Sequence, residues 1–93
     1  MDASKPYQNI FEALEDDQAI AENLIIRAKL MDLLREKIKE KGLPQAEAAR
    51  KLSVSQPRIS DLMRGKIDRF TIDMLVNMLS RIDVHVELCA KAA

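Results

Sequence analysis

The chain has 93 residues, and its 15 basic and 15 acidic side chains give a formal net charge of zero at pH 7. An apolar fraction of 47% excludes an intrinsically disordered chain, and no apolar run approaches the roughly 20 residues needed to span a bilayer. These figures predict one small soluble domain with a single core, to which a second subunit would add stability.

Side chains suited to catalysis or metal binding are scarce. The single histidine and single cysteine, His85 and Cys89, are too few for a zinc site, and the chain has no glycine-rich phosphate loop. The sequence therefore predicts no enzymatic activity, no metal and no cofactor. A lone cysteine forms no internal disulfide, and the N-terminus has no basic segment followed by an apolar block, so a cytoplasmic protein is expected.

For residues 1–16, the sequence predicts an N-terminal arm followed by a short helix. Pro6 and the lack of periodicity before residue 8 favour an irregular arm. Asn9 can cap a short packing helix that ends near Leu14.

A long helix is predicted from about Asp17 to Lys41, because this stretch holds no proline or glycine and Gly42 follows it. Apolar side chains at helical spacing form its predicted inward face, which consists of Ile20, Leu24, Ala28, Met31, Leu34 and Ile38. Further apolar side chains lie off this stripe, at Ile25, Ile26, Leu30 and Leu33. So wide an apolar face predicts contact with a second subunit.

Residues 45–65, QAEAARKLSVSQPRISDLMRG, have the pattern of two short helices joined by a tight turn. The small Ala49 allows the two helices to cross closely, and Val54 is expected to fill the corner between them. The predicted inward positions are Ala49, Leu52, Val54, Ile59 and Leu62. This is a helix-turn-helix pattern, and it predicts a DNA-binding domain over residues 17–83.

The second helix of this pattern has start and stop signals. Ser55 can cap its free amides, Pro57 is tolerated in its first turn, and Gly65 is suited to end it. After it, Lys66 to Phe70 is interpreted as a basic loop.

Thr71 is expected to cap a further helix that closes the core. Its predicted inward face consists of Ile72, Leu75, Val76, Leu79 and Ile82. Beyond it, Val84, Val86 and Leu88 alternate with polar residues, which predicts a half-buried strand. Because no second strand is visible, this strand is expected to pair with the same strand of another copy. The alternative is an apolar tail that continues the last helix or packs on its own domain.

Together these elements predict an all-α fold of about five helices, with residues 84–93 forming a strand and tail that pair across a homodimer. The charge is unevenly distributed, with −5 over residues 1–26, +3 over residues 27–41 and +3 over residues 42–69. A basic surface on and before the helix-turn-helix would attract a polyanion. The alternative is that these lysines and arginines only solvate the surface.

At 100° per residue, the second helix directs a polar face away from its apolar one. Gln56 can pair with adenine in the major groove, and Arg58 can read guanine or hold a phosphate. Asp61 is expected to face a cytosine amine or to pair with Arg58 or Arg64. The predicted DNA-binding set is Gln45, Ser55, Gln56, Pro57, Arg58, Ser60, Asp61, Arg64, Lys66 and Arg69.

For several of these residues a role without DNA contact remains open. Gln56 and Ser60 can be solvent-facing fillers, and Arg64 and Lys66 can serve as cations at a helix C-terminus. Arg58 and Asp61, three positions apart, can form a weak surface pair.

Residues 45–66 resemble the helix-turn-helix domains of the phage lambda repressor and Cro type, the XRE family, and QPRISDLMRGK is the most specific part. The likeness extends over about Asn9 to Leu88 and includes small bacterial regulators such as HigA-like antitoxins. It implies a homodimer that binds an operator and is often encoded beside a toxin. Ser53 departs from the glycine usual in the turn, which predicts local strain or a slightly different local backbone. Pro44 departs from the usual capping threonine.

The sequence therefore predicts a transcriptional regulator that represses by binding a palindromic operator as a homodimer. The resemblance also implies that it can be the antitoxin of a toxin–antitoxin pair. The alternative is a protein that mainly neutralises a partner such as a toxin. The acidic segment from Glu12 to Glu22 would suit a basic partner, although it also fits a solvated helix entrance. RNA is less suited, because the pattern offers no aromatic stacking surface.

Overall fold

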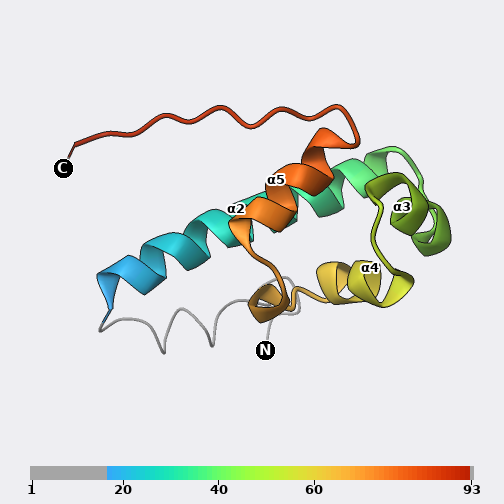
Figure 1. Cartoon of the computed structure of the whole chain (residues 1–93), viewed down its shortest axis with the longest axis horizontal. Helices are drawn as coiled ribbons and strands as arrows, with labels where there is room; N and C mark the ends of the chain where they lie inside the picture. Colours follow the sequence, from blue (N-terminus) through green and yellow to red (C-terminus); the bar gives the residue numbers. More distant parts are fainter. Residues whose placement is uncertain (1–16, 93) are drawn as a thin grey trace.

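The computed structural model describes residues 17–92, so the predicted arm and short helix in residues 1–16 lie outside the described residues. The described part contains four α-helices and one short 3-10 helix (Figure 1). In chain order these are α2 Gln18–Glu40, α3 Gln45–Leu52, α4 Gln56–Met63, η1 Ile67–Arg69 and α5 Ile72–Ser80. The all-α prediction is confirmed for these residues.

The long helix α2 begins and ends close to the predicted positions. The Asp17 side chain accepts hydrogen bonds from the amides of Ala19 and Ile20, at 3.1 and 3.3 Å, and so caps the first turn. Gly42 adopts the left-handed conformation, φ +63°, that lets the chain leave the helix. With 23 residues, α2 is about 34 Å long.

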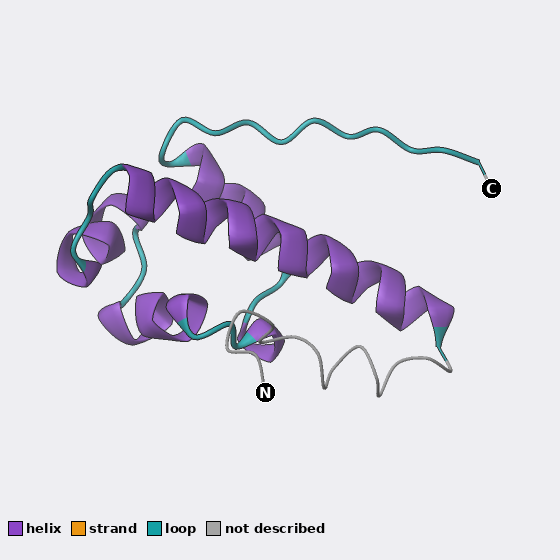
Figure 2. Ribbon diagram, turned by 180° about the vertical axis from the view of Figure 1, so that it is seen from behind, coloured by secondary structure: helices purple, strands orange, loops and turns teal. Residues whose placement is uncertain are grey.

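One face of α2 is buried against the rest of the domain, and α5 packs along it (Figure 2). The buried side chains of α2 are Leu24, Ala28, Leu30, Met31, Leu34 and Ile38. The prediction that Ile20 faces the core is wrong, because this side chain is 45% exposed. The N-terminal part of α2 extends beyond the other helices (Figure 1), and the residues of its first turn, Ile20 among them, are exposed.

Helices α3 and α4 form the predicted helix-turn-helix. Ala49 is buried at the crossing, and the partly buried Val54 packs on the core at the corner, as predicted. Ser53, the residue that stands where glycine is usual, takes the left-handed conformation with φ +57°. Gly65 directly follows Arg64, the C-cap residue of α4, and it also has a positive φ, +71°.

The segment after α4 differs from the prediction of a basic loop. Residues Ile67–Arg69 form η1, and the side chains of Ile67 and Phe70 are each only 1% exposed. The charged residues Lys66, Asp68 and Arg69 led to the prediction of an exposed loop, although Ile67 and Phe70 between and after them are core positions. Thr71 caps α5 as predicted, because its hydroxyl oxygen accepts a hydrogen bond from the Met74 amide at 3.2 Å.

Helix α5 closes the core on α2, with Leu75, Met78 and Leu79 buried. It ends at Ser80, which rules out the alternative in which the tail continues this helix. Residues 84–92 run on as an extended segment without helix or strand in the described chain (Figure 1). Val84 packs partly on the core, whereas Leu88 is 93% exposed. Strand pairing between two copies remains a prediction.

Candidate nucleic-acid interface

Helix α4 presents one buried and one exposed face, as its sequence predicts. Ile59 and Leu62 are fully buried, and the helix packs on α3. On the other side Gln56, Pro57 and Arg64 are exposed. Ser60 and Asp61, also predicted to point outward, are only partly exposed. The geometry therefore supports a polar surface on the short helix α4, which α3 holds in place.

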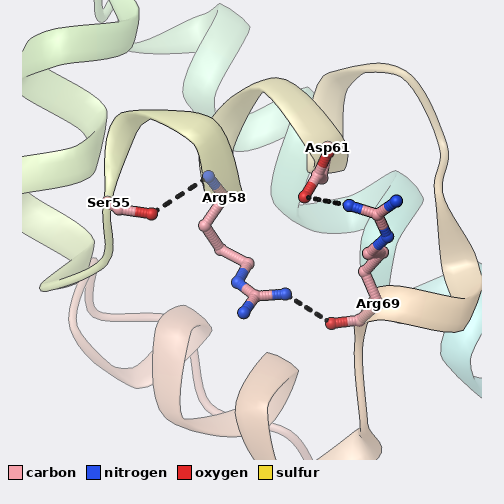
Figure 3. A network of polar contacts seen from close by, with 4 residues as sticks. All are labelled: Ser55, Arg58, Asp61 and Arg69. Atoms are coloured by element: carbon pink, nitrogen blue, oxygen red, sulfur yellow. Dashed lines mark hydrogen bonds and ion pairs between the residues drawn. The ribbon is translucent and has the colours of Figure 1, made fainter.

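Two of the predicted binding residues lie at helix N-termini. The Ser55 hydroxyl accepts a hydrogen bond from the Arg58 amide at 3.2 Å, so Ser55 fixes the start of α4 (Figure 3). Gln45 is exposed at the first position of α3, next to Pro44, which makes no side-chain cap bond. The amides of that first turn are suited to a phosphate oxygen.

Arg58, Asp61 and Arg69 are brought together in one polar network (Figure 3). Arg58 Nη1 donates a hydrogen bond to the backbone carbonyl of Arg69 at 2.8 Å. The guanidinium carbon of Arg58 also lies 5.6 Å from the centroid of the Phe70 ring, a cation–π distance. Arg69 Nη1 lies 3.5 Å from Asp61 Oδ2. The network joins α4 to η1 and to Phe70, which follows it.

This network tests the pairing that the sequence predicted for Asp61, whereas its contact with a cytosine amine stays a prediction. The partner of Asp61 is Arg69, and not Arg58 or Arg64. The interpretation of Arg58 and Asp61 as a surface pair is therefore wrong, although both side chains belong to one network. The Asp61 side chain is 15% exposed and that of Arg69 is 51% exposed, so this long ion pair is partly shielded from solvent.

Arg27 of α2 supports the same segment from its other side, and the sequence analysis missed this role. Arg27 Nη1 donates to the carbonyls of Ile67 and Phe70, at 3.3 and 3.1 Å. Its Nε donates to Asn23 Oδ1 at 2.7 Å, which holds the guanidinium in place. The available signal was spacing, because position 27 falls on the buried stripe that contains Leu24 and Ala28.

Two predicted cations at the end of α4 lie outside the network. Arg64 is exposed and Lys66 is partly exposed, and within residues 17–92 neither side chain has a hydrogen bond or ion pair. Both remain predicted contacts for the DNA backbone.

Residues 17–92 contain no group of three histidine, cysteine, aspartate or glutamate side chains placed to hold a metal ion. Within the same residues, no helix is long and apolar enough to cross a membrane.

Two short helices joined by a left-handed turn, the second with an exposed polar face, define the helix-turn-helix class of nucleic-acid-binding domains. A family model described as a helix-turn-helix domain matches residues 13–91, and the chain belongs to this family. Membership implies DNA binding and a role in regulating transcription. No curated protein matches the chain. The broad resemblance is confirmed, whereas the HigA-like subfamily stays a prediction.

Proposed function

We propose that the protein is a sequence-specific transcriptional repressor that binds a palindromic operator as a homodimer, with residues 17–83 as the DNA-binding domain. The observation that carries this proposal is the geometry of α4, whose apolar Ile59 and Leu62 are fully buried while Gln56, Pro57 and Arg64 are exposed. A helix held in this way can enter the major groove, where base edges display distinct donor and acceptor patterns.

Base reading and backbone contact fall on different residues of this surface. Gln56 is exposed at the start of α4, and its amide can pair with both polar atoms of an adenine edge. Ser60, one turn later, can donate or accept a hydrogen bond. Arg64, Lys66 and the first turn of α3 at Gln45 are suited to phosphate oxygens.

The homodimer is supported by apolar side chains that the described part of the chain leaves uncovered. On α2 these are Ile20, Ile25 and Ile26, and on the C-terminal segment they are Val86 and Leu88. Pairing of residues 84–93 from two copies about a two-fold axis would bury Val84, Val86 and Leu88. The two α4 helices are then expected about 34 Å apart, one turn of DNA.

A binding experiment on selected DNA tests the proposal. An operator is first obtained by selection from random duplexes, and affinity is measured by fluorescence anisotropy on it and on a scrambled duplex. Gln56→Ala is expected to cost about 1–3 kcal/mol and to relax preference at one base pair. Lys66→Gln is expected to weaken binding to all sequences alike, while the exposed Lys29→Gln on α2 serves as the matched control. Equal losses by Gln56→Ala on operator and scrambled DNA would remove the base-reading role.

The exposed isoleucines of α2 also favour a second function, in which the chain binds a partner protein such as a toxin. The resemblance to small antitoxins supports it. If an adjacent reading frame encodes a small basic protein, the two products should copurify at a defined stoichiometry. Copurification that survives Gln56→Ala but fails after Ile25→Asp, in a variant that light scattering shows to be still dimeric, would assign the two functions to separate surfaces, whereas no copurification would leave a freestanding repressor.

A further inference from the structure

The segment from Ile67 to Phe70 is held between α2 and α4 by arginine side chains. Arg27 of α2 donates to the carbonyls of residues 67 and 70, and Arg58 of α4 donates to the carbonyl of residue 69. A short 3-10 helix leaves its last carbonyls without internal partners. The Ile67 carbonyl also accepts from the Phe70 amide at 3.2 Å, whereas the carbonyls of Arg69 and Phe70 are bound by the two guanidinium groups, which connect α4 to α2 through this segment.

Arg58 and Asp61 act on the same residue from one side of α4. They are three positions apart, which places them on neighbouring turns of one helix face. Arg58 binds the backbone carbonyl of Arg69, and Asp61 binds its guanidinium (Figure 3). The face of the Arg58 guanidinium is also occupied by Phe70, a core residue that is 1% exposed. A base contact through Nη1 of Arg58 would break the 2.8 Å hydrogen bond, and a base contact that turns the whole guanidinium would move it from the ring.

We propose that Arg58 is a positioning residue that, with Asp61 and Arg69, fixes the orientation of α4 against α2, and that it does not read a base. This inference rests on the proposed function, because the orientation matters for entry of α4 into the groove. Between α4 and η1 the chain has only residues 64–66, with a glycine at the centre, so side-chain contacts are needed to hold the angle. Arg69 also offsets the Asp61 carboxylate, which would otherwise repel phosphates.

The three possible roles of Arg58 predict different binding data. A base reader loses affinity only where one base pair is changed. A phosphate contact lowers the slope of log affinity against log salt by about one. A positioning residue weakens binding to every duplex, leaves the order of preference intact and leaves the salt slope unchanged.

The first arm of the test uses the free protein. Arg58→Met keeps the packing of the side-chain stem and removes its donors and charge. We expect the amide NMR signals of residues 67–70 and of Gln56 and Ser60 to shift in this variant. Arg50→Met is the matched control, because Arg50 lies on α3 in an exposed ion pair with Glu47. Unshifted signals at residues 67–70 in Arg58→Met would overturn the proposal.

The second arm measures anisotropy on the selected operator and on a panel of its single-base-pair variants, each in a salt series. Arg58→Met is expected to lose about tenfold in affinity on every duplex, which is the usual worth of one hydrogen bond from a charged donor. A loss confined to one base pair, or a salt slope reduced by about one, would overturn the positioning role.

Asp61→Asn and Arg69→Gln provide variants that retain Arg58 if Arg58→Met does not fold. Because Asp61 and Arg69 share one contact, the double variant is expected to lose no more affinity than the stronger single variant. Additive losses would show that Asp61 and Arg69 act separately and would overturn the network. If wild-type protein shows no preference among duplexes, the proposed function fails, while the NMR arm still decides whether Arg58 fixes residues 67–70.

Discussion

Replacing Ser53 by glycine is expected to stabilise the domain. Ser53 follows α3 with φ +57° and ψ +43°, a left-handed conformation that costs a residue with a Cβ about 1–2 kcal/mol. Glycine adopts this conformation freely, but it also gains about 0.4–1 kcal/mol of conformational freedom in the unfolded chain. The Ser53 side chain is exposed, so little packing is lost. The free energy of unfolding should therefore rise by about 0.5–1 kcal/mol.

Urea denaturation followed by circular dichroism measures this change, and thermal unfolding should move upward by about 2–8 °C. Ser53→Ala is the matched control, because it keeps the Cβ and with it the backbone cost, so no gain is expected. Gly42→Ala is expected to change the free energy of unfolding in the opposite direction, by lowering it. Gly42 has φ +63° and open space around it, so only the backbone cost of about 1 kcal/mol should appear. If Ser53→Gly proves no more stable than wild type, the left-handed turn is not a source of strain.

Three further predictions concern other contacts. Ser55→Ala removes the acceptor of the Arg58 amide and should lower the unfolding free energy by about 1 kcal/mol in urea; an unchanged midpoint would contradict the cap. Arg27→Met removes the donor to two carbonyls and should cost about 2 kcal/mol, with the exposed Lys29→Met unchanged as control. Deleting residues 84–93 should halve the mass measured by light scattering, and a retained dimer would refute the strand pairing.

The elements that the sequence predicted well are those specified by local chemistry. The cap at Ser55 depends on a hydroxyl and an amide only three residues apart, and the cap at Thr71 has the same form. The end of α2 at Gly42 depends on a single backbone conformation. Such signals need no knowledge of the tertiary structure, which is why the bounds of α2 and the starts of α4 and α5 agree closely with the predicted helices.

The errors arise where distant segments meet. Ile67 and Phe70 look like parts of a basic loop, because their burial depends on how residues 67–70 pack against α2, some forty positions earlier in the chain. The partner of Asp61 is eight residues away, beyond the end of its helix, so helical spacing does not reveal it. Ile20 continues the apolar stripe of α2, yet it is exposed because the helix is longer than the core that it covers.

The same distinction limits what a charge count says about DNA binding. Residues 42–69 carry six basic side chains and a net charge of +3, which predicts a surface for a polyanion. Three of these cations already bind protein groups. They are Arg50, Arg58 and Arg69. Lys51, Arg64 and Lys66 have no such partner within residues 17–92, so they are the cations of this segment that can release counterions from DNA without breaking an internal contact. Arg50, Arg58 and Arg69 instead bind groups of the protein. The electrostatic contribution to DNA binding should therefore be smaller than the net charge of +3 suggests.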